Sequence, residues 1–188
     1  MIGADRIALG ILAGGQASRL GGVDKAMQPL GEATLLARTL AGFPQTFAER
    51  LLSYNRGPAP ALPTGLRIVP DQRAGHPGPL AALEALAQAT RQDWLLTVPV
   101  DCRRLPDGLV EGLARAAAGD GAVVRDGDGL QPLVGLWRVA ALRLAVAAAF
   151  DAGDLVVHRL LTRLDLGCHD ITPLCLGNLN TPSDFIAP

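Results

Sequence analysis

Short apolar runs alternate with longer amphipathic segments along this chain. The run Ile7–Leu12 is apolar throughout, as expected of a strand that is covered on both faces. Five further short runs are predicted to be strands, at residues 50–53, 66–69, 94–98, 122–124 and 133–137. Strands that alternate with helices indicate parallel strands joined by crossover helices, so the fold class is predicted to be α/β.

The segments between these strands carry helix signals. Thr34 is a suitable N-cap residue, and Gly42 is a suitable end for the helix that follows it. Pro79 comes directly after Gly78 and stands at a first helical position, where its missing N–H costs nothing. Three further helices are predicted, at residues 106–118, 139–149 and 181–184. The last of them depends on the capping sequence Thr-Pro-Ser-Asp.

Length and composition fit one domain that spans residues 1–188 and buries an apolar core. The chain is 49% hydrophobic and 19% charged, and 17 basic residues stand against 18 acidic ones. A net charge of -1 lacks the positive field of a surface that binds nucleic acid or an anionic membrane. The longest apolar candidate, 139–150, is interrupted by Arg143 and falls short of the roughly 18 residues that a membrane span needs. We therefore expect no nucleic acid and no membrane among the partners.

Cysteine usage and the N-terminal sequence favour the cytoplasm. Cys102, Cys168 and Cys175 are odd in number and lack the CxxC spacing of a metal or redox site. They are expected to be reduced thiols. Asp5 stands where a signal peptide would have a basic start, and only a short apolar run follows it.

A glycine-rich loop joins the first predicted strand to the first helix. Residues 12–25 read LAGGQASRLGGVDK and follow a strand's carboxyl end, where ligands bind in open α/β sheets. Glycines let backbone N–H groups approach phosphate oxygens, and Arg19 and Lys25 can add positive charge. Lys25 is the only lysine of the chain. The loop matches neither GxxxxGK[ST] nor GxGxxG, which disfavours an ATPase or a dinucleotide-binding protein. A plain turn that contains a chance lysine remains the alternative.

Polar residues also follow three of the other predicted strands. Asp71 and Asp101 come directly after apolar runs, so they are expected at the same edge of the sheet as the glycine loop. Mg²⁺ usually combines one or two protein carboxylates with phosphates and waters, and Asp101 is the metal candidate. Asn55 could bind a ribose or a base, and Gly78 begins a helix at this edge. For each of these residues, an ordinary turn or cap is the competing interpretation.

The ordered set of motifs resembles that of the molybdenum cofactor guanylyltransferases (the molybdopterin-guanine dinucleotide biosynthesis protein A family). That family lies within the nucleotidylyltransferase superfamily. The resemblance implies a Rossmann-like three-layer α/β/α fold with a mostly parallel central sheet. The matching segments cover almost the whole chain and are residues 12–15, 18–25, 55–56, 69–71, 78–81, 99–101 and 178–182.

The resemblance implies transfer of GMP from GTP to the terminal phosphate of molybdenum-bound molybdopterin, which forms molybdopterin guanine dinucleotide and diphosphate. Mg²⁺ is the implied cofactor. The implied partners are GTP and molybdenum-bound molybdopterin, together with other molybdenum cofactor assembly proteins and acceptor oxidoreductases. By matched position, the nucleotide-binding residues would be Leu12, Ala13, Gly14, Gly15, Lys25, Asn55, Asp71, Gly78 and Asp101.

Catalytic roles are implied for Lys25, Asp101 and Arg19, with Asp101 also binding Mg²⁺, and Asn178 and Asn180 match positions near the pterin. After the metal position the family usually continues with a small polar residue and proline, whereas this chain has residues 102–106, CRRLP. Two alternatives stay open at this point. One is a related nucleotidylyltransferase that uses CTP or a sugar or lactyl phosphate acceptor, and the other is a non-catalytic nucleotide-binding assembly protein.

Overall fold

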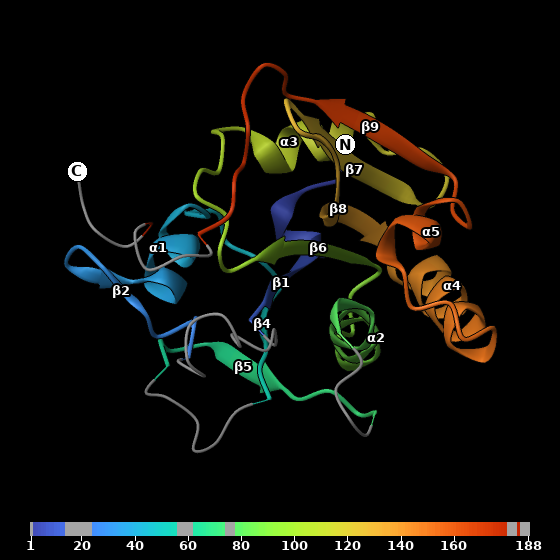
Figure 1. The fold of residues 1–188 in the computed structure, drawn as a ribbon, viewed down its shortest axis with the longest axis horizontal. Helices are drawn as coiled ribbons and strands as arrows, with labels where there is room; N and C mark the ends of the chain where they lie inside the picture. The colour runs from blue at the N-terminus through green and yellow to red at the C-terminus, as the bar shows by residue number, and fades with distance from the viewer. Residues whose placement is uncertain (1, 14–23, 56–61, 74–77, 180–183, 185–188) are drawn as a thin grey trace.

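The computed structural model describes residues 2–13, 24–55, 62–73, 78–179 and 184, and Figure 1 shows their arrangement. Its main feature is a seven-stranded sheet with the order β5-β4-β1-β6-β8-β7-β9. The strands are β1 (Ile7–Leu12), β4 (Glu49–Ser53), β5 (Leu66–Val69), β6 (Trp94–Pro99), β7 (Gly121–Asp126), β8 (Gly129–Arg138) and β9 (Leu166–Asp170). A separate two-stranded sheet pairs β2 (Pro29–Leu30) with β3 (Ala33–Thr34).

Most neighbouring strands are parallel, as the sequence predicts. Strands β5, β4, β1 and β6 pair in parallel, and so do β7 and β9. Strand β8 is the exception, because it runs antiparallel to both β6 and β7. The turn between β7 and β8 is short, since Asp126 pairs directly with Gly129. Such a tight hairpin connects antiparallel strands, whereas parallel ones need a longer crossover.

Helices cover both faces of the sheet. They are α1 (Leu35–Ala41), α2 (Pro79–Ala89), α3 (Leu109–Ala116), α4 (Val139–Asp151) and α5 (Val157–Leu161), preceded by a 3-10 turn, η1 (Ala4–Arg6). Figure 1 shows α2, α4 and α5 on one side of the sheet and α1 on the other. The buried side chains form two cores that match this division, because α1 and α3 contribute to one and α2, α4 and α5 to the other. The predicted three-layer α/β/α fold is confirmed.

Strand β1 lies between the two cores and supplies both. Ile7, Leu9 and Ile11 are fully buried in the core under α1 and α3, whereas Ala8 and Leu12 belong to the core under α2 and α4. Successive side chains of a strand point to opposite faces, so a strand with helices on both sides must be apolar at every position. This requirement explains the continuous apolar run that the sequence shows.

Some sequence-based predictions need correction. The helix predicted at 106–118 is the shorter α3, because Gly108 has a left-handed φ of 72° and occupies the N-cap position before Leu109. Strand β9 and helix α5 were not predicted. Of the short helix predicted at 181–184, only Asp184 belongs to the described residues.

Within the described residues, no helix has the length and apolar character that a membrane crossing requires. Cys102 is buried, Cys168 and Cys175 are exposed, and all three are free thiols. Burial, together with the negative charges of Asp101 and Asp126, raises the pKa of the Cys102 thiol to about 12. This cysteine is therefore protonated at neutral pH and unsuited to act as a nucleophile or a metal ligand.

Candidate active site

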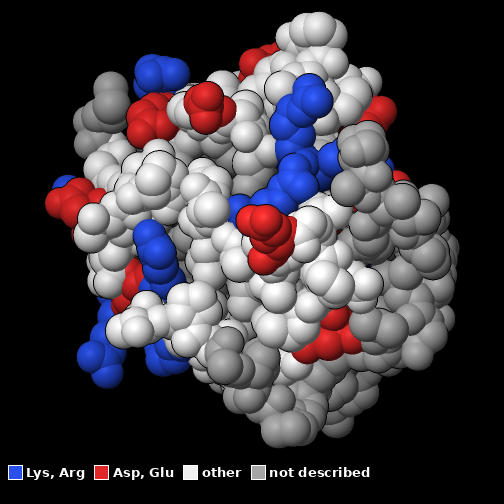
Figure 2. Space-filling model, turned by 90° about the vertical axis from the view of Figure 1, so that its left-hand side faces the viewer, with Lys and Arg blue, Asp and Glu red and all other residues white. Residues whose placement is uncertain are grey.

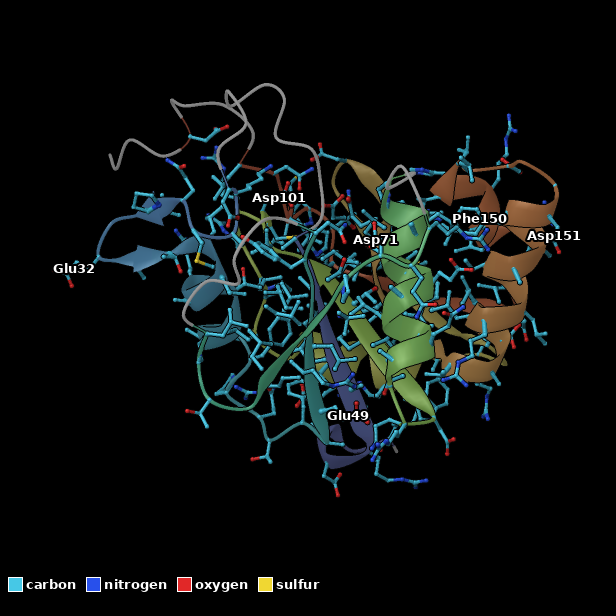
Figure 3. The ribbon with its side chains drawn as sticks, turned by 90° about the horizontal axis from the view of Figure 1, so that it is seen from below. Glu32, Glu49, Asp71, Asp101, Phe150 and Asp151 are labelled. Atoms are coloured by element: carbon cyan, nitrogen blue, oxygen red, sulfur yellow. The ribbon has the colours of Figure 1, made fainter. Side chains whose placement is uncertain are left out.

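The site lies where the parallel strands end. Figure 3 places Asp71 and Asp101 at one end of the sheet and Glu49, the first residue of β4, at the opposite end. The ends of the strands are held together by backbone hydrogen bonds beyond the regular ladder. Ala13 N donates to the carbonyl of Ser53, at 3.1 Å, and Val100 N donates to that of Leu12, at 3.0 Å. The glycine loop therefore leaves the sheet from a rigid point, with Leu12 and Ala13 almost fully buried.

Lys25 and Asp101 meet at this edge although 76 residues separate them in sequence. The Lys25 ammonium donates to Asp101 Oδ2 at 2.6 Å, and the side chains are 16% and 21% exposed. The pair is accessible from solvent yet too covered to be an ordinary surface ion pair. The prediction that both residues share one edge of the sheet is confirmed. Gly14, Gly15 and Arg19, predicted beside them, lie outside the described residues.

Asn55 and Asp71 join the ends of β4 and β5. The side-chain oxygen of Asn55 accepts a hydrogen bond from the backbone N–H of Asp71, at 2.7 Å. The Asn55 Nδ2 group is buried and has no hydrogen-bond partner among the described residues. A buried amide donor normally finds an acceptor, so this group is suited to bind an acceptor atom of a ligand. Asn55 thus holds the backbone of Asp71 with its side-chain oxygen, while its Nδ2 group can donate to a ligand.

Arg73 fixes the other side of the Asp71 loop. Its guanidinium forms two hydrogen bonds with the Glu84 carboxylate on α2, both of 2.7 Å, and stacks 3.7 Å from the centre of the Phe150 ring on α4. The hydrogen bond to Glu84 raises the pKa of Arg73. Figure 3 shows Phe150 and Asp151, the last two residues of α4, on the side of α2 that faces away from Asp101. The loop is thereby attached to α2 and α4, two of the three helices on this face of the sheet.

Helix α2 begins at the same edge of the sheet. Gly78 is its N-cap residue with a φ of 84°, a conformation that favours glycine, and Pro79 occupies the first turn as predicted. In Figure 3 the end of α2 next to Asp71 is the end where the helix begins. Its first backbone N–H groups therefore point toward the strand ends, where they can bind an anion or a polar ligand atom.

Tyr54 and Asp24 are two site residues that sequence reasoning missed. The Tyr54 hydroxyl donates a hydrogen bond to Asp24 Oδ2, and Asp24 Oδ1 accepts from the N–H of Ala26 at 3.0 Å. Tyr54 is the only tyrosine of the chain, and it precedes Asn55 just as Asp24 precedes Lys25. Their positions next to Asn55 and Lys25 were the only sequence signal for these two residues. The contact between them could not be inferred, because it joins segments that are 30 positions apart.

A short segment near the C-terminus pairs with the backbone of Asp101 and Cys102. Leu179 N donates to the backbone carbonyl of Asp101 at 2.9 Å, and Asn178 forms an antiparallel bridge with Cys102. The predicted pterin residue Asn178 is thus placed beside the predicted metal residue. Asn180, its companion in the prediction, lies outside the described residues.

The residues after Asp101 make this part of the site basic. Arg103 and Arg104 are exposed, and the Arg103 guanidinium pairs with Asp184. Arg38, on α1, donates to the carbonyl of Arg103 at 3.4 Å. Figure 2 views the face that carries α1 and shows a run of basic side chains across it. The altered 102–106 sequence therefore places additional positive charge next to Asp101.

The buried carboxylate of Asp126 holds the C-terminal segment through a hydrogen bond. This carboxylate is only 2% exposed and accepts hydrogen bonds from the backbone of Leu176, the backbone of Asp128 and the side chain of Gln131, each at 2.9 Å. Burial alone would raise the pKa of this carboxyl, but these hydrogen bonds outweigh burial and hold the pKa below its ordinary value. Leu176 in turn accepts from the N–H of Arg104, at 3.0 Å.

We expect Asp126→Asn to lower the free energy of unfolding by about 2 kcal/mol at pH 7, because an amide cannot accept all these bonds. A carboxylate with a lowered pKa stabilises the fold above its unfolded-state pKa and loses that effect as pH falls through the folded-state value. The difference from wild type should therefore shrink below about pH 4. Urea unfolding across pH measures it, with the exposed Asp128→Asn as control; a difference that does not change with pH would contradict the assignment.

The donor set at this edge fits Mg²⁺. In the described part of the chain, no group of three or more His, Cys, Asp or Glu residues could hold a metal ion by itself. Asp101 instead offers one carboxylate beside Lys25 at the strand ends. Mg²⁺ is commonly held by one or two carboxylates together with substrate phosphates and water, so one protein carboxylate suffices.

The chain is similar to known proteins over most of its length. Residues 9–166 match the MobA-like NTP transferase domain. The chain belongs to this family. It is 33% identical, over 92% of its length and 86% of the relative's, to the molybdenum cofactor guanylyltransferase of Shewanella piezotolerans. Its identity to the protein of that name from Photobacterium profundum is 31%, over 98% and 96% of the two chains. The protein is accordingly a nucleotidyltransferase.

Solved structures share the fold at lower identity. Molybdopterin-guanine dinucleotide biosynthesis protein A from Archaeoglobus fulgidus superposes with a TM-score of 0.72 at 18% identity, covering 95% of this chain and 94% of its own. The 2-C-methyl-D-erythritol 4-phosphate cytidylyltransferase of Thermus thermophilus gives a TM-score of 0.67 at 19% identity, covering 94% of each chain. At such identities the likeness establishes the fold alone. It does not distinguish between nucleotides.

Proposed function

We propose that this protein transfers GMP from GTP to the terminal phosphate of molybdenum-bound molybdopterin and releases diphosphate. The observation that carries the proposal is the contact of Lys25 with Asp101, 2.6 Å apart at the carboxyl ends of the strands. An ammonium and a carboxylate at that edge suit the binding of a nucleoside triphosphate with a divalent ion. The choice of GTP as nucleotide and of molybdopterin as acceptor follows from the relatives that are named molybdenum cofactor guanylyltransferase.

The reaction needs positioning and charge stabilisation more than proton transfer. An oxygen of the acceptor phosphate forms a bond to the α-phosphorus of GTP while the bond to the bridging oxygen of the β-phosphate breaks. The electron pair of that bond leaves with diphosphate. The acceptor phosphate is already an anion at neutral pH, so no protein base has to deprotonate it. The rate then depends on how well the protein brings two polyanions together and stabilises the charge that develops.

The chain's own residues supply most of that stabilisation. Lys25 is proposed to bind phosphate oxygens, together with Arg19 and backbone N–H groups of the glycine loop that follows Ala13. Asp101 would hold Mg²⁺, and the bound ion supplies positive charge that polarises the phosphate oxygens. Asn55 is proposed to donate its buried Nδ2 group to the nucleoside. Asp71 and the start of α2 at Gly78 complete the nucleotide side.

The acceptor is proposed to bind on the side of Asp101 where residues 178–179 pair with it. Asn178 lies there, paired with the residue after Asp101, and Asn180 is assigned to the same side by its matched position. The exposed guanidinium of Arg104 adds a positive charge that suits a phosphate. Other cofactor assembly proteins and acceptor oxidoreductases are proposed as later partners. The cytoplasm is the proposed compartment, because free thiols such as Cys168 persist in a reducing environment.

One assay tests the function directly. The purified protein is incubated with Mg²⁺, GTP and molybdenum-loaded molybdopterin, and the products are separated to detect the guanine dinucleotide and diphosphate. Parallel reactions use CTP, ATP and UTP, and others omit the acceptor. The proposal is supported if a dinucleotide forms from GTP and the acceptor, and not from CTP, ATP or UTP or in the absence of the acceptor. A cytosine product would indicate a cytidylyltransferase, and binding of GTP without diphosphate release under any condition would indicate a non-catalytic protein.

A further inference from the structure

We propose that the Tyr54 hydroxyl is a positioning group for Lys25 and acts on it through Asp24. Tyr54 itself is not proposed to touch the substrates. The inference rests on the proposed role of Lys25 in nucleotidyl transfer. It adds a residue, Tyr54, to which neither the sequence motifs nor the comparisons assign a role. Its basis is a chain of contacts that leads from the interior of the sheet to the lysine.

Asp24 organises the turn that presents Lys25. One carboxylate oxygen of Asp24 accepts from the N–H of Ala26 at 3.0 Å, and the carbonyl of Asp24 accepts from Met27 at 3.2 Å. The carbonyl of Lys25 accepts from Gln28, also at 3.2 Å. This is the local pattern by which an aspartate stabilises a turn. The side chain of Asp24 therefore helps to fix the backbone position from which the Lys25 side chain extends.

Tyr54 attaches that turn to the sheet. Its hydroxyl donates to the second carboxylate oxygen of Asp24, and a hydrogen bond to a charged acceptor is among the stronger kinds. Tyr54 is 6% exposed and packs in the same core as the fully buried Ala26. Its backbone N–H donates to the carbonyl of Val69 at 3.2 Å. The phenol ring thus has little freedom to move, and it transmits that rigidity to the turn.

The position of Tyr54 in the sequence also links the two sides of the nucleotide site. The next residue, Asn55, holds the backbone of Asp71 at 2.7 Å. Two consecutive residues at the end of β4 therefore anchor both the lysine turn and the Asp71 loop. Figure 3 places Asp71 and Asp101, the partner of Lys25, at the same end of the sheet. Loss of the phenol oxygen should disturb the lysine side and leave the Asn55 link unchanged.

Tyr54→Phe removes this oxygen and keeps the ring that fills the core. We expect kcat to fall by about tenfold, as when a group that orients a functional residue is lost. The KM for GTP should change by less than about threefold, because Lys25 still carries its charge. In a Lys25→Ala background the same substitution should have no further effect, since Tyr54 acts through the lysine. Thr97→Val, which removes another buried hydroxyl that bonds Leu133 and Trp137, should leave kcat unchanged.

A spectroscopic measurement reports the contact itself. Because the chain has only one tyrosine, protein labelled with ¹³Cζ-tyrosine gives one resonance that can only come from Tyr54. We expect Asp24→Asn to shift this resonance, because the phenol then donates to a neutral amide instead of a carboxylate. The measurement requires no activity and remains informative if Tyr54→Phe does not fold.

The outcomes separate this inference from the proposed function. An active wild type together with wild-type kcat in Tyr54→Phe would overturn the positioning role, and so would an equal loss in the Lys25→Ala background. An unshifted tyrosine resonance in Asp24→Asn would overturn the contact. A wild type that forms no product with any acceptor would overturn the proposed function, while the resonance would still test the contact.

Discussion

Lys25→Ala is expected to lower kcat by about a hundredfold or more, by analogy with the loss of one preorganised group that stabilises a transition state. The ammonium lies at the strand ends, 2.6 Å from Asp101, where phosphate charge would develop. No other lysine exists in the chain to replace it. Diphosphate release measured under saturating GTP and acceptor reports kcat without the contribution of weakened binding.

Two variants control this experiment. Arg91→Ala also removes one positive charge, but from an exposed residue near the start of β6, at the opposite end of the sheet; it should turn over like wild type. Lys25→Arg keeps the charge but replaces a compact ammonium by a planar, wider guanidinium. We expect it to recover only part of the rate. Wild-type kcat in Lys25→Ala would exclude the proposed role of the ammonium.

The sequence predicted the half of the sheet that carries the nucleotide site well. Strands β1, β4, β5 and β6 each contain a short apolar run. In β1, which helices cover on both faces, every position is apolar, whereas β4 and β5 also carry partly exposed polar residues such as Glu49 and Arg67. The shared direction of the four strands brings all their carboxyl ends to one edge. This topological rule predicts from the sequence alone that Lys25 and Asp101 lie together.

The other edge of the sheet was harder to predict. Strand β9 contains Gly167, His169 and Asp170, which are untypical of a strand, and its side chains are at most half-buried. A Cβ at Gly167 would lie 1.7 Å from the carbonyl oxygen of Ala116, so the glycine is required by close packing against the end of α3. The strand forms because it pairs with β7. Such long-range pairing leaves little trace in the local sequence.

Tyr54, Asp24 and Asp126 could not be recognised from the sequence for the same reason. The contact of Tyr54 with Asp24 joins residues 30 positions apart, and the hydrogen bond that Leu176 N donates to Asp126 spans 50 positions. Each residue is ordinary in its local sequence, since aspartates are common in turns and a tyrosine suits a strand end. Motifs identify groups that touch substrates, whereas groups that hold those residues in place become visible only in the folded chain.

Asp101→Asn is the second substitution with a large expected effect. It keeps the size of the side chain and removes the negative charge that would hold Mg²⁺ and that pairs with Lys25. We expect kcat to fall by about a hundredfold or more. The Mg²⁺ concentration for half-maximal rate should rise by about tenfold or more, because an amide is a weaker ligand than a carboxylate for a hard cation. Initial rates across a Mg²⁺ titration at fixed GTP measure both quantities.

Asp107→Asn is the matched control, because Asp107 is an exposed acid that follows Asp101 in the same connection between β6 and α3. It changes the net charge by the same amount and should leave the Mg²⁺ titration as in wild type. The double variant with Lys25→Ala adds a further test. Lys25 and Asp101 are in contact, so their effects on kcat should be far from additive. Additive losses, or a normal Mg²⁺ titration for Asp101→Asn, would mean that the two groups do not act as one unit at the metal.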